Sequence, residues 1–237
     1  MEQYYKIAGL TVMMDSFGRA AAQARPYEID PAEPDLILKA DRKAIQRRYP
    51  GMPEDECEYS ATCVAFYQSL LDFDGLMLHA SAVVMDGRAY LFTAMPGTGK
   101  STHTALWRRA FGDERARILN DDKPALRWED GQFFAYGTPW SGKSDLNLNL
   151  RVPLGGVCLL SRGEENVIEP FTGSGALFTL LEQTVRPADA AGRRKLMNLL
   201  EKLLATVPVW KMRCNMETQA AWVSYRAMSG CGKEETT

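Results

Sequence analysis

The pattern of hydrophobic and polar positions predicts strands at the start of the chain and helices alternating with strands after it. Residues 5–13 contain enough β-branched and aromatic side chains for a strand, and the apolar run in residues 35–40 predicts another. Several prolines interrupt the interval between these two segments. In residues 58–73 the hydrophobic positions recur every three or four residues, which predicts a helix. We therefore expect an irregular, β-rich lead-in followed by a helix.

A strand, turn, strand, loop and helix are predicted from position 79 onward. Residues 79–84 and 89–93 are apolar runs of the kind found in buried strands, and residues 85–88 contain an Asp-Gly pair that favours a tight turn between them. A loop with one proline and two glycines follows. Residues 100–111 then have the pattern of a helix, and Gly112 is typical of a helix end.

The rest of the chain continues this alternation. We expect, in chain order, a strand at 116–120, a hairpin of 126–128 with 132–136, a second hairpin of 157–161 with 166–168 across 162–165, helices at 175–185 and 193–205, a strand at 207–212 and a helix near 218–228.

Length and composition indicate a globular protein with one large domain, or a core with an appendage. The chain has 237 residues, of which 46% are hydrophobic and 24% charged, and these values exclude a disordered or collagen-like chain. We expect a β-rich N-terminal subregion at 1–60 packed on the core, a catalytic domain at 61–228 and a polar tail at 229–237. The net charge of −2 argues against a protein that mainly coats nucleic acid or an anionic membrane.

The sequence also predicts a cytoplasmic location. Its apolar stretches are far shorter than the roughly 18 residues of a membrane-spanning helix, and the first residues lack the basic start and apolar run of a secretory signal. The cysteines are odd in number and widely spaced, which predicts reduced thiols rather than disulfides or a zinc site. They are Cys57, Cys63, Cys158, Cys214 and Cys231.

The loop before the predicted helix at 100–111 has the composition of a phosphate-binding loop. Glycines allow successive backbone N–H groups to turn inward, and the helix that follows adds the positive end of its dipole. Lys100 is expected to bridge β- and γ-phosphate oxygens, and the Ser101 hydroxyl to complete the coordination of Mg²⁺. Ala94 stands where the strict motif has glycine. The residues expected to hold the nucleotide are Met95, Pro96, Gly97, Thr98, Gly99, Lys100, Ser101 and Thr102.

Two adjacent carboxylates follow the strand predicted at 116–120. Because strands of an open α/β sheet present their carboxyl ends at the edge that carries such a loop, we expect Asp121 and Asp122 to lie near the phosphates. Neighbouring side chains on a strand point to opposite faces, so the two need not have the same task. One could reach the metal while the other accepts a proton from an attacking hydroxyl. Which aspartate is the base stays open at this point.

Three segments together resemble a known catalytic domain, that of HPr kinase/phosphorylase and its relatives, whose fold is shared with phosphoenolpyruvate carboxykinases. The resemblance covers roughly residues 75 to 212, and it lies in the order and spacing of the segments. It implies an α/β protein with a mixed β-sheet core that contains the phosphate loop. The segments are His79-Ala80-Ser81-Ala82-Val83-Val84 with the Asp86-Gly87 turn, the phosphate loop, and Asn120-Asp121-Asp122.

The resemblance implies roles for individual residues. His79, Lys100 and Asp122 would be catalytic, with Asp122 as proton acceptor from the substrate serine, while Ser101 would bind Mg²⁺ and Asp121 would support the metal or the loop. Residues 137–143 lie where a second loop beside the phosphates is expected. Lys143 in this segment, or alternatively Arg186, would add positive charge there. His103 is expected to be structural or at the surface.

The chain also departs from the bifunctional enzymes of that family. We identify neither their additional metal-binding glutamate, nor their downstream arginine-containing segment, nor an N-terminal regulatory domain of their size. Phosphorolysis is therefore not established. The chain resembles the compact kinase relatives, some of which phosphorylate serine in small precursor peptides.

These features predict a kinase that uses ATP or another nucleoside triphosphate with Mg²⁺. The acceptor would be a hydroxyl, most simply serine, on a peptide, protein or small molecule, with neither nucleic acid nor membrane as a partner. Carboxykinase-like chemistry, a nucleotide-binding module without turnover and a nucleoside-monophosphate kinase are the alternatives. Homo-oligomerisation, nucleotide preference and acceptor identity stay open.

Overall fold

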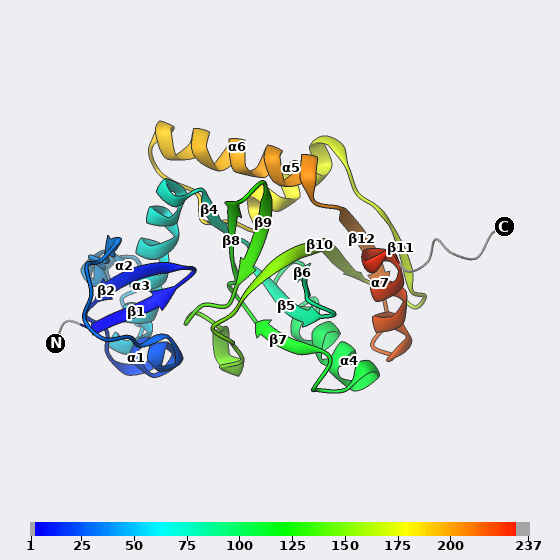
Figure 1. The fold of residues 1–237 in the computed structure, drawn as a ribbon, viewed down its shortest axis with the longest axis horizontal. Helices are drawn as coiled ribbons and strands as arrows, with labels where there is room; N and C mark the ends of the chain where they lie inside the picture. Colours follow the sequence, from blue (N-terminus) through cyan, green and yellow to red (C-terminus); the bar gives the residue numbers. More distant parts are fainter. Residues whose placement is uncertain (1–2, 231–237) are drawn as a thin grey trace.

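Nine strands form the main sheet of the protein in a computed structural model that describes residues 3–230 (Figure 1). Their order is β4-β8-β9-β10-β6-β5-β7, and β12 pairs with both β10 and β11. The strands are β4 (Gly75–Met77), β5 (Ala80–Met85), β6 (Arg88–Thr93), β7 (Arg117–Asn120), β8 (Ala125–Glu129), β9 (Gln132–Tyr136), β10 (Arg151–Arg162), β11 (Val167–Pro170) and β12 (Val209–Cys214).

The long strand β10 makes the sheet curl, because it changes partners along its length. Its first residues, from Arg151 to Pro153, pair antiparallel with β9. From Leu154 onward it runs parallel to β6, and from Val157 to Arg162 its other edge pairs in parallel with β12. The result is a curved, mixed sheet, and the expected α/β class is confirmed at that level.

Strand direction places several strand ends at one edge of this sheet. β6, β10 and β12 run parallel to one another, and β7 has the same direction because β5 is antiparallel to both β6 and β7. The carboxyl ends of these four strands therefore lie at the same edge as the amino end of β5. Segments far apart in the sequence meet there.

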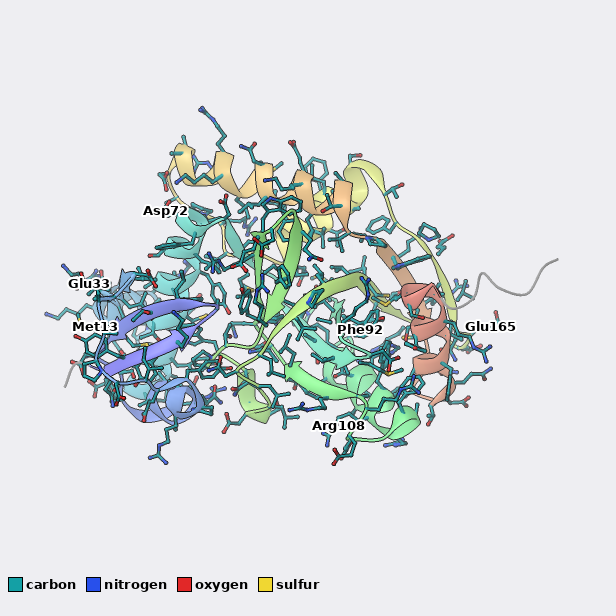
Figure 2. The ribbon with its side chains drawn as sticks, in the orientation of Figure 1. Met13, Glu33, Asp72, Phe92, Arg108 and Glu165 are labelled. Carbon is teal, nitrogen blue, oxygen red and sulfur yellow. The ribbon has the colours of Figure 1, made fainter. Side chains whose placement is uncertain are left out.

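Helices cover both faces of the sheet. α4 (Lys100–Phe111) and α7 (Gln219–Ser229) pack on one face, and α5 (Gly173–Glu182) and α6 (Ala190–Thr206) lie on the other (Figure 1). The alternation of side chains along β6 supplies both cores: Tyr90 and Phe92 point toward α4, and Ala89 and Leu91 toward α6. Figure 2 shows Phe92 in the interior and Arg108 at the outer edge of α4.

The N-terminal subregion contains helices that the hydrophobic pattern does not predict. The elements before the main sheet are β1 (Gln3–Ile7), β2 (Leu10–Met14), α1 (Gly18–Ala24), η1 (Arg25–Tyr27), β3 (Leu36–Ile37), α2 (Arg42–Arg48), α3 (Glu54–Leu70) and η2 (Leu71–Phe73). The lead-in is therefore a small three-stranded sheet with helices α1 and α2, rather than β-rich alone. α1 and α2 have seven residues each, too short to show a clear helical period in the sequence.

Two strand predictions in this subregion need correction. The single strand expected at 5–13 is a hairpin, because Ala8 and Gly9 adopt positive φ angles of 50° and 79° and reverse the chain. The strand expected at 35–40 is reduced to the two residues of β3. The helix expected at 58–73 is confirmed as α3, which begins earlier, at Glu54, and runs through position 60 without a break.

The hairpin predicted for 157–161 with 166–168 does not form. β11 pairs antiparallel with β12, and β12 occupies the edge of β10 that a hairpin partner would take. The sequence after β10 has the pattern of a short turn between two paired strands. The strand that pairs with β10 there is β12, which begins more than forty residues later. By contrast the hairpin of β8 and β9, with Asp130 and Gly131 at positive φ, is confirmed, as is the turn at Asp86 and Gly87.

Residues 1–2 and 231–237, and with them Cys231 and almost all of the expected polar tail, lie outside the described residues. Between residues 3 and 230 no helix has the length and apolar character needed to cross a membrane.

We expect Gly137→Ala to destabilise the fold by about 3 kcal/mol, because a side chain does not fit there. A Cβ atom at this position would lie 1.9 Å from the Leu148 carbonyl oxygen and 2.8 Å from that of Leu119. Denaturant unfolding measures the change, with Gly51→Ala as control because a Cβ at Gly51 meets nothing within 4 Å. Equal stability of the two variants would contradict the close packing of the 137–148 segment on β7.

Candidate active site

The predicted site residues converge at the edge of the sheet where the parallel strands end. Ala80 at the start of β5 pairs with Thr93 at the end of β6, and Ala82 pairs with Asn120 at the end of β7. The backbone N–H of Ala80 also donates to the carbonyl of Asp122 at 3.1 Å. His79, the loop after Thr93 and the aspartate pair after Asn120 are therefore neighbours. Strand polarity predicted this for the loop and the aspartates.

The loop from Ala94 to Gly99 leads directly from β6 into α4. Gly97 and Gly99 have φ angles of 77° and 118°, a region that disfavours side chains, and the Thr98 N–H closes a turn on the Met95 carbonyl at 3.2 Å. Gly99 is the N-cap of α4 and provides no side chain to cap it. The first N–H groups of the helix are thus free to bind an anion.

Lys100, the first residue of α4, is half-buried. Its ammonium group donates a long hydrogen bond of 3.4 Å to the Ala94 carbonyl and forms no ion pair within residues 3–230. Burial lowers the pKa of Lys100, while the negative charges of Asp122 and Asp121 act in the opposite direction. A half-buried cation with spare donors and no direct counterion suits a phosphate group.

Asp122 contacts two basic side chains. His79 Nε2 lies 2.9 Å from its Oδ1, and the Lys123 ammonium group bonds to its Oδ2. Burial alone would raise the pKa of Asp122, but the hydrogen bond from His79 and the charge of Lys123 outweigh it and lower this pKa to about 2. Asp122 is therefore a carboxylate at neutral pH, held in place from two sides.

The Asn120 side chain fixes the backbone that carries Asp122. Its Oδ1 accepts hydrogen bonds from the N–H groups of Asp122 at 2.9 Å and Lys123 at 2.6 Å. Its Nδ2 donates to the carbonyl oxygen of Thr138 at 2.9 Å. Gly142 packs against Asp122, since a Cβ on that glycine would lie 2.8 Å from the aspartate Cβ. The carboxylate is thus positioned by groups from β7 and from the 138–142 segment.

Asp121 faces a different set of partners. Its Oδ1 accepts a hydrogen bond of 2.6 Å from the Ser81 hydroxyl, which lies 2.7 Å from the Thr104 hydroxyl on α4. Thr104 in turn donates to the carbonyl oxygen of Ser101 at 3.2 Å. Asp121 is therefore linked through β5 to the first turns of the helix that follows the loop, and its hydrogen-bond partners differ from those of Asp122.

Stability should depend on pH through Asp122. Because its folded-state pKa is lowered to about 2 from an ordinary 3.8, the ionised carboxylate stabilises the fold at neutral pH, and this contribution is lost as the pH falls through that interval. We expect the difference in unfolding free energy between the wild type and Asp122→Asn to shrink by about 2 kcal/mol between pH 5 and 2. Denaturant titrations at several pH values measure it. A difference independent of pH would show that the ion pairs do not form.

Lys143 directly follows Gly142, which packs against Asp122, so its predicted role beside the phosphates stays a prediction. Lys143 is in the short helix η3 (Gly142–Ser144) and lines a surface depression beside Arg48 and Tyr49, which the loop residues do not reach. His103 is buried behind the loop, where its Nε2 lies 3.0 Å from Ser224 Oγ, and burial lowers its pKa to about 4. His103 was expected to be structural or at the surface, and it is buried.

Three residues of this region were not singled out from the sequence. Lys123 follows the aspartate pair directly, so its charge was visible there, but its contact with Asp122 was not. Asn120 was part of the motif without an assigned task. Arg162, at the end of β10, donates to the Gly97 carbonyl oxygen at 2.6 Å, and nothing in the sequence connects these two positions.

Comparison with known proteins gives one family match. A family model described as SynChlorMet cassette protein ScmC matches residues 56–222, which is more than half of the chain. No curated protein matches the chain. Among solved structures, the Hpr(Ser) kinase/phosphatase from Coxiella burnetii is 14% identical over 68% of this chain and 99% of its own, with a TM-score of 0.39. A likeness at that level assigns no residue roles in this chain.

Proposed function

The chain belongs to the family described as SynChlorMet cassette protein ScmC, and we propose that it is a nucleotide-dependent kinase that transfers a γ-phosphoryl group to a hydroxyl. One observation carries the proposal: Lys100 at the start of α4, which has no ion pair within residues 3–230, and a positioned carboxylate, Asp122, lie at the same edge of the sheet. A kinase needs these two groups together, one for the phosphates and one for the acceptor.

The phosphates would lie on the loop between β6 and α4. The free N–H groups at the start of α4 and the Lys100 ammonium group both favour negative charge there. Gly97 and Gly99 leave the approach open, since a Cβ on Gly97 would meet nothing within 4 Å. Met95, with 64% of its surface exposed, and the flanking loop residues would border the triphosphate.

Asp122 would hold the acceptor hydroxyl and take its proton. As the acceptor oxygen bonds to the γ-phosphorus, the bond from that phosphorus to the bridging oxygen breaks, the nucleoside diphosphate leaves with that electron pair, and the proton passes to Asp122. A carboxylate with a pKa of about 2 is a weak base. In a loose transition state the hydroxyl loses little of its proton before the new bond forms, so orientation by Asp122 matters more than basicity.

His79 and Lys123 would keep this carboxylate oriented. Each carboxylate oxygen of Asp122 already accepts a hydrogen bond from one of these two side chains. A carboxylate has about four lone-pair sites, so lone pairs remain available for the acceptor hydroxyl. His79 itself is held by its backbone N–H, which donates to the Gln183 carbonyl at 2.7 Å. Lys123 also places positive charge next to the position of the transferred group.

The residues near the loop provide too few ligands to bind Mg²⁺ by themselves, but they fit Mg²⁺ that is also coordinated by the phosphates of a nucleotide. Within residues 3–230 no three His, Cys, Asp or Glu side chains cluster as a metal site. Mg²⁺ commonly binds one or two protein oxygens with phosphates and water, and Ser101 and Asp121 would hold it. When bound, Mg²⁺ supplies positive charge to the β- and γ-phosphates. The Ser81 hydroxyl orients Asp121 for this role through its 2.6 Å hydrogen bond.

The proposed acceptor is a hydroxyl, most simply serine, on a peptide, protein or small molecule. The test is a transfer screen with γ-labelled ATP and GTP and Mg²⁺ against serine-containing peptides and small alcohols. We expect label on at least one acceptor and none on the matching alanine peptide. Tight nucleotide binding without hydrolysis or transfer would support a binding module instead, and phosphoenolpyruvate formed from oxaloacetate would support carboxykinase-like chemistry.

A further inference from the structure

A pocket of about 510 Å³ opens beside the phosphate loop, at the ends of β10 and β12. The loop residues Gly97 to Gly99 form one wall, and Leu106 of α4, Leu160 of β10 and Met216 after β12 provide apolar surface. Arg162 stands at the junction of the pocket and the loop, because its guanidinium group donates to the Gly97 carbonyl oxygen. A pocket of this size suits a small organic ligand.

The pocket and the Asp122 cluster lie on opposite sides of the loop. β6, which leads into the loop, has β10 and then β12 on one side and β5 and then β7 on the other. The pocket is lined from the ends of β10 and β12, whereas Asp122 follows β7. A triphosphate lying across the loop would therefore have one end at the pocket and the other at Asp122.

The chemistry of the pocket favours the uncharged end of such a ligand. Most of its lining is carbon and sulfur, and Arg162 and Glu164 contribute opposite charges, which leaves no net attraction for an anion. Met216 has 77% of its surface exposed, unusual for an apolar residue next to a pocket. A flat aromatic ring placed against Met216, over the buried Leu106 and Leu160, would remove the exposed surface of Met216 from water.

The pocket is also preformed at its outer wall. The Asn215 side chain donates to the Glu164 carbonyl at 3.0 Å, pairs with Asn166 at 3.1 Å and accepts the Glu217 N–H at 3.1 Å. These bonds tie the segment after β10 to the segment after β12. A wall held in this way loses little entropy when a ligand binds.

We infer that this pocket receives the nucleobase of the nucleoside triphosphate, with Arg162 beside the sugar and the α-phosphate. The inference rests on the proposed function, since it assumes that phosphates lie on the loop. It assigns Leu106, Leu160 and Met216 to contact with the base. It also orients the nucleotide, with the γ-phosphate directed toward β7.

The test compares ATP with inorganic tripolyphosphate, which has the phosphates but no base. We expect Met216→Ala to weaken ATP binding about 10-fold and to leave tripolyphosphate binding unchanged, because the removed side chain contacts only the base. Isothermal titration calorimetry measures both ligands. Phe178→Ala is the matched control, an exposed apolar residue on α5, and should change neither affinity.

Each result separates this inference from the proposed function. A first outcome is that the wild type binds ATP while Met216→Ala either weakens the binding of ATP and tripolyphosphate equally or changes neither affinity. In both cases the base lies elsewhere, and the kinase proposal stands. If the wild type binds neither ligand, the proposed function fails and the inference with it. A second measurement uses 8-azido-ATP: photolabelling of residues 160–164 or 214–216 supports the assignment, and labelling confined to residues 120–123 overturns it.

Discussion

Asp122→Asn is expected to lower the rate of phosphoryl transfer about a hundred- to ten-thousandfold while nucleotide affinity stays nearly constant. The amide cannot accept the proton of the hydroxyl, and it loses the ion pair with Lys123 and the carboxylate that His79 contacts. Asp122 follows β7 and does not lie on the loop, so the phosphates would keep their contacts. Transfer of label to an acceptor found in the screen measures the rate, and calorimetry with ATP measures the affinity.

The control for this variant is Asp113→Asn. Asp113 is an exposed carboxylate just after α4 that pairs with Arg108 at 2.8 Å, and its loss should leave transfer unchanged. Unaltered ATP binding by Asp122→Asn would show that the variant is folded at the loop. Full turnover by Asp122→Asn would rule Asp122 out as the group that orients the acceptor.

Lys100→Met should weaken ATP binding about a hundredfold or more and abolish transfer at ordinary ATP concentrations. The substitution keeps the length of the side chain but removes the charge that would contact the phosphates. The free energy of unfolding should not fall. The ammonium group is half-buried without an ion pair among the described residues, and burial lowers its pKa, which means that the folded state disfavours this charge. Calorimetry with ATP and denaturant unfolding measure the two quantities.

Lys202→Met is the matched control for Lys100→Met. Lys202 on α6 is also partly buried, and its ammonium group lies 4.7 Å from the centre of the Trp128 ring, far from the loop in the fold. Its replacement should leave ATP affinity unchanged and cost at most a little stability. Equal ATP affinity of the wild type and Lys100→Met would mean that the loop does not hold the phosphates.

Elements with strong local signals were predicted well. Helix α4 begins at Lys100 and ends before Gly112 as expected, because the glycines on both sides and the apolar spacing act within a few residues. The turn at Asp86 and Gly87 forms because these residues tolerate positive φ. β5, β6 and β7 lie within one or two residues of their predicted bounds, and the site that they carry follows from their direction.

Predictions failed where long-range pairing decides the structure. The expected hairpin after β10 is absent because β12 takes its place, and no local feature of residues 162–165 could show this. Ala8, at positive φ in the β1–β2 turn, was missed because alanine is an unusual residue there. The short helices α1 and α2 are held by packing on α3 rather than by a periodic pattern of their own.

For this protein, the sequence by itself determined the chemical groups of the site: a glycine-containing loop ending in Lys100, and two carboxylates after a buried strand. Composition and spacing suffice for this, since each motif lies within a few consecutive residues. The tertiary structure alone decided that His79 and Lys123 hold Asp122, that Arg162 contacts Gly97, and that a pocket lies beside the loop. These contacts depend on the order and register of the strands, which arise from packing across the whole chain.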